Sequence, residues 1–257
     1  MITSASNSQV RNIINLLKKS GERKRHGLFV IEGIRMFREV PPESVQSVYV
    51  SESFAKEHGE ALRGLCFETV KDSVFERMSD TRTPQGILAS VRMPEYTLED
   101  ILRADNPLII VLENIQDPGN LGTIVRTAEG AGASGIIMSK DTADLYNPKT
   151  VRSTMGSVYR LPFIYAEDIC AAVRNLGKTG IKTCAAHLEG AQEYYNIDYT
   201  GPVAVLIGNE GNGLTEELTA AAQSRIRIPM GGKLESLNAA VSAAVILYEA
   251  ARQRRLV

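Results

Sequence analysis

The first part of the chain alternates short apolar runs with amphipathic segments. Between residues 8 and 19 apolar side chains recur at helical spacing, and a basic turn follows at 22–27. Apolar runs at 28–31, 47–50 and 86–91 predict strands, while segments 33–40, 52–63 and 71–79 predict helices. Met93-Pro94 interrupts this pattern. We therefore predict a small α/β domain at 1–93 and a linker at 94–106, with one or two helical turns at 97–103.

The second part, 107–257, is a series of strongly apolar runs separated by helical segments. The runs that predict strands are 108–112, 135–138, 161–165, 181–186, 203–208 and 225–229. Runs this apolar are typical of parallel strands that are covered on both faces. The sequence therefore predicts an α/β domain with a mostly parallel sheet, and such sheets bind ligands at the carboxyl ends of their strands.

Composition narrows the class of protein. The 257 residues are 44% hydrophobic and 23% charged, which excludes a disordered chain and gives enough length for two domains. No apolar run approaches the roughly 20 residues of a membrane helix, and the amino terminus lacks the apolar core of a signal peptide. We therefore expect no membrane association and a cytoplasmic location. Cys66, Cys170 and Cys184 form no CxxC pair and the histidines show no ligand spacing, so neither a disulfide framework nor a metal site is expected.

Positive charge is concentrated near the amino terminus. The formal net charge is only −1, yet residues 1–40 carry eight Lys or Arg against three acidic residues. Such a surplus is typical of a face that binds a polyanion, and equally of an ordinary solvated helix surface. Charge alone does not decide between the two.

Three polar, glycine-containing segments each follow a predicted strand of the second part. Segment 113–132 contains an Asp-Pro-Gly turn at 117–119 and a predicted helix at 123–129. Segment 205–214 holds three glycines, and segment 228–250 runs from a loop into a helix rich in alanine. Taken singly, these are also compatible with a glycine-rich turn and a close-packed core helix. Segment 113–132 contains no GxGxxG loop and the chain has no P-loop, which disfavours a Rossmann-type enzyme of small metabolites and nucleoside triphosphate hydrolysis.

Together the three segments resemble the motifs of the SpoU-type (TrmH-like) RNA 2'-O-ribose methyltransferases. The matching residues are Asn120, Arg126 and Thr127, then Gly-Asn-Glu-Gly-Asn-Gly-Leu at 208–214, then Ile-Pro-Met at 228–230 and Ser-Leu-Asn at 236–238. The part at 1–93 resembles the small RNA substrate-binding domain that many of these enzymes carry. The resemblance implies a trefoil-knotted methyltransferase domain, S-adenosylmethionine (SAM) as cofactor, and a homodimer formed through the knotted domains.

The resemblance also assigns roles by motif position. The catalytic set that it implies is Arg126, Asn120, Glu210, Ser236 and Asn238. Because a guanidinium stays protonated, we expect Arg126 to hold the adjacent phosphate and the developing alkoxide, with proton removal by phosphate or water. SAM is expected against Leu206, Ile207, Gly208, Ile228, Met230 and Leu237, mostly through their main chain. Glycine at 208 would allow a close approach to the cofactor.

RNA contacts are implied in both parts of the chain. The expected contacts are Lys18, Lys19, Arg23, Lys24, Arg25 and Arg35 in the first domain, and Arg152, Ser153 and Arg160 beside the substrate cleft. The implied function is methyl transfer from SAM to a ribose 2'-hydroxyl of RNA, with ribosomal RNA favoured because of the added RNA-binding domain. The alternatives are transfer RNA as substrate, or a catalytically silent RNA-binding or ribosome-assembly factor on the same fold. Arg126 and the Ser-Leu-Asn run are both present, which favours an active enzyme.

Overall fold

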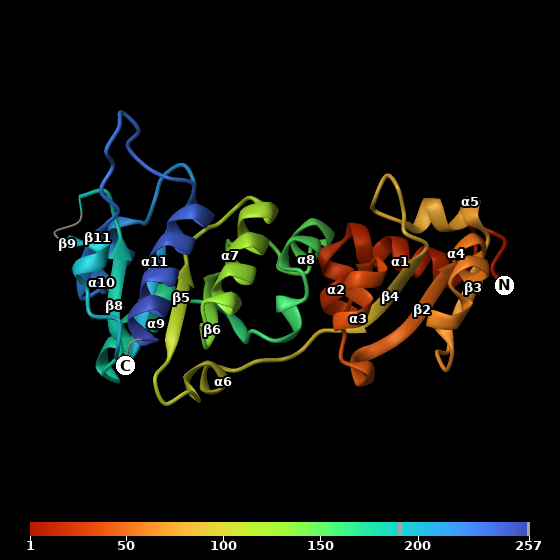
Figure 1. Cartoon of the computed structure of the whole chain (residues 1–257), viewed down its shortest axis with the longest axis horizontal. Helices are drawn as coiled ribbons and strands as arrows, with labels where there is room; N and C mark the ends of the chain where they lie inside the picture. The colour runs from red at the N-terminus through yellow and green to blue at the C-terminus, as the bar shows by residue number, and fades with distance from the viewer. Residues whose placement is uncertain (190–191, 256–257) are drawn as a thin grey trace. The chain divides into compact units, whose positions relative to one another are not determined.

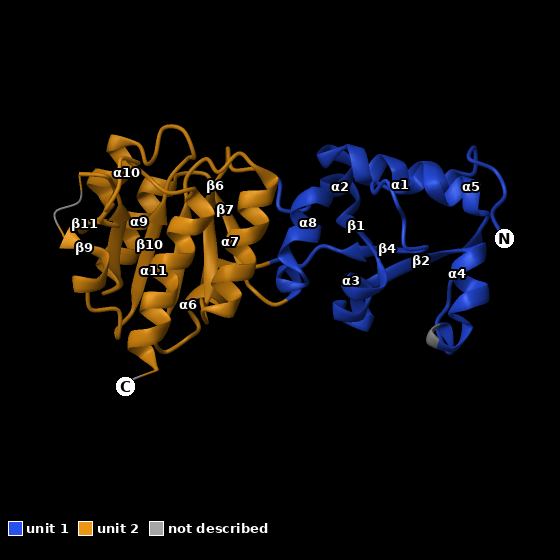
Figure 2. Ribbon diagram, turned by 45° about the horizontal axis from the view of Figure 1, so that its top comes forward, with its two compact units in different colours: residues 1–95, 144–159 blue, residues 96–143, 160–257 orange. Residues whose placement is uncertain are grey.

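The computed structural model describes residues 1–189 and 192–255, which divide into two compact units (Figures 1 and 2). Unit 1 consists of Met1–Glu95 together with Asp144–Tyr159, and unit 2 consists of Tyr96–Ala143 and the described residues from Arg160 onward. The segment 144–159 was expected within the second domain. It packs instead on the first strand of unit 1, where the Phe29 and Tyr146 rings lie 4.8 Å apart. Aromatic packing of this kind explains why the segment clusters with the amino-terminal residues.

Unit 1 is built on a four-stranded sheet with the order β1-β4-β2-β3. The strands are β1 (Leu28–Glu32), β2 (Val45–Ser51), β3 (Glu68–Val70) and β4 (Ile87–Arg92). Strand β4 runs antiparallel to β1 and β2, and β2 pairs with β3 in parallel. The helices are α1 (Ser8–Lys18), α2 (Ser20–His26), α3 (Ile34–Glu39), α4 (Glu52–Glu57), α5 (Asp72–Phe75) and α8 (Pro148–Thr154), with 3₁₀ turns η1 (Pro42–Ser44), η2 (Gly59–Leu62), η3 (Glu76–Met78) and η4 (Ser157–Tyr159).

The amphipathic pattern of α1 explains how it joins this sheet. Val10, Ile13 and Leu16 are buried in a cluster that includes Val30 of β1 and Leu88 of β4. The predicted basic turn at 22–27 is in fact part of helix α2, because residues 22–25 (Glu-Arg-Lys-Arg) are all good helix formers and follow Gly21 in its first turn. Gly27 ends that helix with φ of 61°, a left-handed conformation that glycine adopts without strain.

Unit 2 contains a seven-stranded sheet with the order β7-β6-β5-β10-β8-β11-β9. Its strands are β5 (Leu108–Leu112), β6 (Gly135–Ser139), β7 (Phe163–Ala166), β8 (Lys182–Ala186), β9 (Gln192–Glu193), β10 (Val203–Ile207) and β11 (Ser224–Arg227). Every pairing between these strands is parallel. The predicted fold class, α/β with a mostly parallel sheet, is therefore confirmed.

Helices cover both faces of this sheet. They are α6 (Leu98–Leu102), α7 (Pro118–Gly130), α9 (Ile169–Lys178), α10 (Glu216–Ala221) and α11 (Ala239–Arg254), with the 3₁₀ turn η5 (Tyr194–Asn196). Residues of α6, α9 and α10 share one core cluster with β5 and β10, whereas α7 and α11 pack against each other (Figure 2). No helix within 1–189 and 192–255 has the length and apolarity that crossing a membrane requires.

The strand order places a topological switch point between β5 and β10. From β5 the chain moves outward to β6 and then to β7, and afterwards it crosses to β8 on the far side of β10. Connecting segments leave in opposite directions at such a point, and this opens a crevice at the carboxyl ends of the strands. The site is therefore expected at the carboxyl ends of β5 and β10.

Candidate active site

Hydrogen bonds between side chains join the three motif segments at this edge of the sheet. The amide Nδ2 of Asn120 donates to Oε1 of Glu210 at 3.0 Å. The amide Nδ2 of Asn238 in turn donates to Oδ1 of Asn120 at 3.1 Å. Three of the five predicted catalytic residues, one from each segment, are thus brought together.

Asn120 is positioned by the start of helix α7. The side chain of Asp117 accepts a hydrogen bond from the main-chain nitrogen of Asn120 at 2.8 Å and so caps the helix. Pro118 occupies the first helical position, where its missing N–H is no loss. The helix therefore starts at Pro118, not at residue 123 as predicted, and Asn120 lies in its first turn.

Asn238 has the same kind of capping role at the start of α11. Its Oδ1 accepts from the main-chain nitrogens of Ala240 at 2.9 Å and Val241 at 3.4 Å. The cap uses the oxygen of the amide, so the NH₂ group is left to donate to Asn120. One side chain therefore begins the last helix and ties it to the first motif segment.

Glu210 accepts hydrogen bonds from the first motif segment. Besides Asn120, the main-chain nitrogens of Gln116 at 3.3 Å and Asp117 at 3.2 Å donate to its carboxylate. Partial burial opposes ionisation, but these donors outweigh it and hold the pKa of Glu210 below its ordinary value. Glu210 is thus a carboxylate at neutral pH whose oxygens are already engaged. It is better suited to holding the loop than to accepting a proton.

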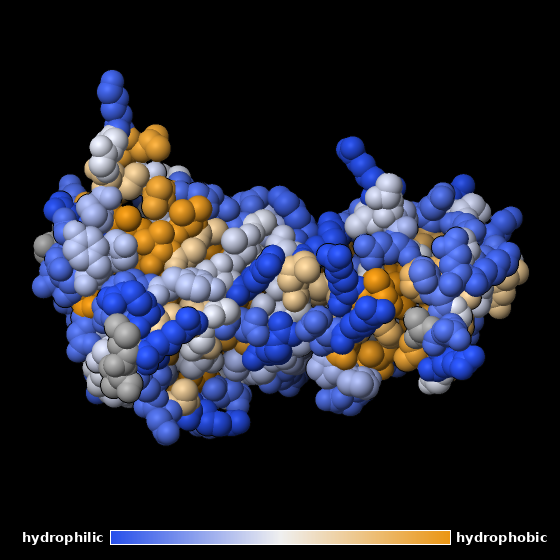
Figure 3. All heavy atoms as spheres, viewed as in Figure 1, coloured by the Kyte–Doolittle hydropathy of each residue, from blue (hydrophilic) through white to orange (hydrophobic). Residues whose placement is uncertain are grey.

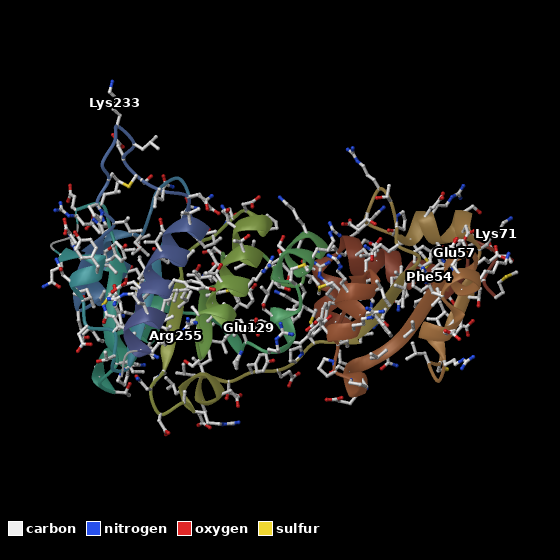
Figure 4. The ribbon with its side chains drawn as sticks, viewed as in Figure 1. Phe54, Glu57, Lys71, Glu129, Lys233 and Arg255 are labelled. Carbon is white, nitrogen blue, oxygen red and sulfur yellow. The ribbon has the colours of Figure 1, made fainter. Side chains whose placement is uncertain are left out.

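Arg126 and Ser236 lie outside this series of hydrogen bonds. Arg126 is exposed on α7 and makes no hydrogen bond or ion pair with any residue that the structure describes. Ser236 is exposed in the loop between β11 and α11. Lys233 stands at the outer end of the same loop and points into solvent (Figure 4). The Arg126 guanidinium is therefore available for a ligand.

Of the expected SAM contacts, Leu206 and Ile207 lie in the centre of the sheet. Their exposed fractions are 0% and 2%, and the Ile207 carbonyl accepts a hydrogen bond from the Glu113 main chain at 3.0 Å. Such residues can meet a ligand only through their main chain.

Gly208 follows Ile207, and the reason for its glycine differs from the expected one. A Cβ at this position would lie 2.1 Å from the Gly213 carbonyl carbon. The chain at 209–213 folds back over Gly208, with paired main-chain hydrogen bonds of 2.9 Å between Asn209 and Gly213. The protein's own backbone, rather than an approaching cofactor, excludes a side chain here.

The loop from β11 to α11 has the features of a main-chain binding site. Ile228, Met230 and Leu237 are half-buried in it. Residues 229–237 make no hydrogen bond with other residues of the described ranges. Polar main-chain groups beside partly buried apolar side chains suit a ligand with an apolar ring system and polar edges, as SAM has. The residues that are present therefore fit the expected cofactor.

The cations expected to contact RNA fall into two groups in unit 1. Lys18, Lys19, Lys24, Arg25 and Arg35 are exposed. Arg23 differs, because only 3% of it is exposed. Its guanidinium donates to the Leu16 carbonyl at 2.7 Å and to the carboxylate of Asp144. We therefore reassign Arg23 from RNA contact to internal anchor.

The three expected contacts near the cleft all have partners within their own unit. In unit 1, Arg152 pairs with Asp80 at 2.8 Å and the Ser153 hydroxyl donates to the Lys149 carbonyl at 2.9 Å. In unit 2, Arg160 pairs with Glu129 at 2.7 Å. An RNA phosphate would have to compete with these carboxylates for each arginine.

Sequence reasoning missed two residues that shape the site. Gln116 donates from Nε2 to the Asp141 carbonyl at 2.6 Å, and Glu113 accepts from the main-chain nitrogen and hydroxyl of Thr215, each at 2.7 Å. The sequence signal that could have found Gln116 is its place directly before the Asp-Pro-Gly turn. Among the described residues, no group of three His, Cys, Asp or Glu is arranged to hold a metal ion.

Comparison with known proteins finds relatives that align with nearly the whole chain. The chain is 31% identical over 249 residues to the 23S rRNA (guanosine(2553)-2'-O)-methyltransferase RlmP of Bacillus subtilis, covering 96% of this chain and 97% of the relative. It is 32% identical over 267 residues to a 23S rRNA (uridine(2479)-2'-O)-methyltransferase of Streptomyces viridochromogenes, covering 93% and 88%. The crystal structure of the SpoU methyltransferase AviRb from that organism with AdoMet matches with a TM-score of 0.85 and 30% identity, covering 97% of this chain and 98% of that one.

Two family models account for most of the chain. Residues 7–89 match the MRM3-like substrate binding domain. Residues 107–248 match the SpoU rRNA Methylase family, and this range contains all three motif segments. Because that match spans more than half of the chain and the relatives align over nearly all of it, the chain belongs to the SpoU rRNA methylase family.

Proposed function

We propose that this protein transfers the methyl group of SAM to a ribose 2'-hydroxyl of ribosomal RNA. The observation that carries the proposal is the hydrogen-bonded series Glu210–Asn120–Asn238, which joins all three family motifs at the carboxyl edge of the sheet. Relatives that align over nearly the whole chain are ribosomal RNA 2'-O-methyltransferases by name. Transfer RNA is the alternative substrate.

The reaction is a displacement in which the ribose oxygen must be held against an electrophilic carbon. When bound, SAM supplies that carbon as the methyl group of a sulfonium. The exposed guanidinium of Arg126 binds the phosphate next to the target ribose and stabilises negative charge that develops on the 2'-oxygen. The hydroxyl proton passes to the phosphate or to water, because Arg126 stays protonated and the Glu210 oxygens are engaged.

Asn120, Glu210 and Asn238 are positioning residues in this scheme. They hold the first motif segment, the 209–213 turn and the start of α11 in one arrangement. Main-chain groups of Leu206, Ile207, Gly208, Ile228 and Met230 would hold SAM, with Leu237 forming an apolar wall and Ser236 facing the polar end. Fixed geometry of this kind supplies much of the rate in a displacement reaction.

Unit 1 supplies RNA affinity in this proposal. Lys18, Lys19, Lys24, Arg25 and Arg35 are exposed cations that can contact backbone phosphates without reading sequence. Arg152, Ser153 and Arg160 would join them only after exchanging their present partners. RNA binding by unit 1 should therefore weaken steeply with salt.

We also propose a homodimer formed through α11. Val241 and Tyr248 of this helix are 47% and 51% exposed, and the half-buried Ala244 and Val245 lie between them at helical spacing. Figure 3 shows hydrophobic atoms gathered over the first part of this helix. An apolar stripe on a surface helix is typical of an interface. The trefoil knot, which the family resemblance implies, and the cytoplasmic location, which was expected from the sequence, stay predictions.

The test is transfer of labelled methyl groups. Purified protein is incubated with isotopically labelled SAM and, separately, with unmodified ribosomal RNA and transfer RNA. We expect label in ribosomal RNA, at least 100-fold less with Arg126→Ala, and full incorporation with the control Arg255→Ala, an exposed arginine at the end of α11 (Figure 4). Label in transfer RNA alone would show that the substrate is transfer RNA and not ribosomal RNA. Absence of SAM binding would favour a silent RNA-binding factor.

A further inference from the structure

A cavity of about 290 Å³ opens at the switch point, on the side of the sheet that carries α9. Its walls come from the carboxyl ends of β5, β6, β7 and β10. They are formed by Glu113, Asn114, Ser139, Lys140, Asp141, Ala166, Glu167, Ile169, Asn209 and residues 212–215. None of the residues assigned above to SAM lines it. The cavity is therefore separate from the proposed cofactor site.

Four polar lining side chains are free to meet a ligand. Lys140, Asp141, Glu167 and Asn212 are exposed and make no side-chain hydrogen bond or ion pair within the described residues. Two other polar groups are already used, because Glu113 accepts from Thr215 and the Asn114 oxygen accepts from Gln116. The free groups are thus two carboxylates, one ammonium and one amide.

Charge and size limit what the cavity can take. With Glu113 included, three carboxylates face one ammonium, which repels phosphate and favours a neutral ligand rich in N–H donors. The volume lies just below the range of about 300–1,000 Å³ for ligand pockets, so it suits a single nucleobase rather than a whole dinucleotide. Single-stranded RNA is recognised in this way, by bases that leave the stack and form hydrogen bonds along their Watson–Crick edge.

Among the four bases, guanine has the matching edge. Its N1–H and N2–H donors lie side by side and fit the two oxygens of one carboxylate, and the neighbouring O6 accepts from an ammonium. Uracil offers a single donor between two acceptors, and adenine offers a donor beside an acceptor. A carboxylate from Asp141 or Glu167 together with the Lys140 ammonium therefore selects guanine.

The cavity is linked to the proposed active site by short hydrogen bonds. The Asp141 carbonyl accepts from the Gln116 side chain at 2.6 Å, and the Gln116 main chain donates to Glu210 at 3.3 Å. On the other wall, the Asn209 side chain donates to the Asn114 carbonyl at 2.8 Å. A base in the cavity would lie one layer of residues away from the Glu210–Asn120–Asn238 series.

We propose that this cavity is a guanine-binding subsite for the RNA substrate, in which Lys140, Asp141 and Glu167 read the Watson–Crick edge of one base. The proposal rests on the proposed function, since it assumes that RNA enters at this edge of the sheet. It adds a determinant of base specificity to that site.

The test uses the full chain saturated with S-adenosylhomocysteine, so that the cofactor site cannot bind a nucleoside. Guanosine, inosine, adenosine and uridine are titrated at millimolar concentration and followed by NMR. We expect guanosine to bind, inosine to bind several-fold more weakly because it lacks the N2 amino group, and uridine and adenosine not to compete. Asp141→Asn and Glu167→Gln are the variants, and at least one of them should weaken guanosine binding about tenfold.

The matched control is Asp105→Asn, an exposed aspartate before β5 at the opposite end of the same sheet. It should bind guanosine like the unchanged protein. The proposal is overturned if guanosine does not bind, if uridine binds equally well, or if both variants bind guanosine normally. Affinity for S-adenosylhomocysteine, measured on the same samples, reports separately on the proposed function. A loss of guanosine binding with normal cofactor affinity supports the subsite, whereas failure of cofactor binding counts against the methyltransferase proposal alone.

Discussion

Replacing Gly208 by alanine tests the structure of the proposed SAM site at its tightest point. The added methyl group would lie 2.1 Å from the Gly213 carbonyl carbon and 2.2 Å from the Leu214 nitrogen. Both neighbours are main-chain atoms, so no rotation of a side chain can relieve the clash. Because ordinary contact begins at 3.4 Å, the 209–213 turn would have to move by about 1.3 Å.

The magnitude of the effect follows from that displacement. Overpacking in a buried region costs about 1–3 kcal/mol. The two main-chain hydrogen bonds between Asn209 and Gly213 would be strained as well, at about 1 kcal/mol each. We therefore expect Gly208→Ala to lower the free energy of unfolding by about 3 kcal/mol. A shift of about 1 Å in groups that position the reactants also reduces turnover about 100-fold.

The assays are urea unfolding, calorimetric titration with S-adenosylhomocysteine, and methyl transfer. Gly211→Ala is the matched control, because its Cβ would come no closer than 3.5 Å to the Asn209 side chain, an ordinary contact. We expect the control to fold and to bind cofactor normally. If Gly208→Ala were as stable and as active as Gly211→Ala, the packing of the turn over Gly208 would be refuted.

Three further predictions follow from the geometry. Arg23→Ala should destabilise the protein by about 3 kcal/mol in urea unfolding, because it leaves a carboxylate and a buried carbonyl without their donor. Arg152→Ala, whose ion pair is exposed, should cost less than about 1 kcal/mol. Equal losses of stability would contradict the assignment of Arg23 as an anchor. Tyr248→Arg should shift the protein from dimer to monomer in sedimentation experiments, and a dimer of unchanged affinity would exclude α11 as the interface. Because the pKa of Glu210 is lowered, the stability that its ionised carboxylate contributes is complete at pH values above the ordinary glutamate pKa and is lost only as the pH falls through the folded-state pKa. The difference in free energy of unfolding between the protein and Glu210→Gln should therefore persist at neutral pH and disappear in acid. A difference that vanishes near neutral pH would show that the pKa of Glu210 is not lowered.

The central strands were predictable from the sequence because burial on both faces leaves an unbroken apolar run. The predicted strand at 108–112 is β5 of the structure. Residues 68–70 and 192–193 were missed as strands, since two or three residues carry no periodicity. Helix α7 starts five residues before the predicted position, because Asp117-Pro118-Gly119 is typical of a turn but aspartate followed by proline is also a helix start.

The residues of the site were predictable only in part. Motif resemblance selected Asn120, Glu210 and Asn238, and the structure brings these three together. The burial of Arg23 was not predictable, because its partner Asp144 lies far away in the sequence. For the same reason, nothing in the sequence indicates that the 209–213 turn itself requires a glycine at 208. The burial of Arg23 and the need for glycine at 208 both result from contacts between segments that are not adjacent in the sequence.

The most direct test of the account is the chemical position of the transferred methyl group. Ribosomal RNA is incubated with the protein and SAM that carries a deuterated methyl group, digested to nucleosides, and examined by mass spectrometry. The account predicts that the deuterated group lies on the ribose of one nucleoside and is absent when Arg126→Ala is used. Label on a base, or undiminished ribose methylation by Arg126→Ala, would contradict it.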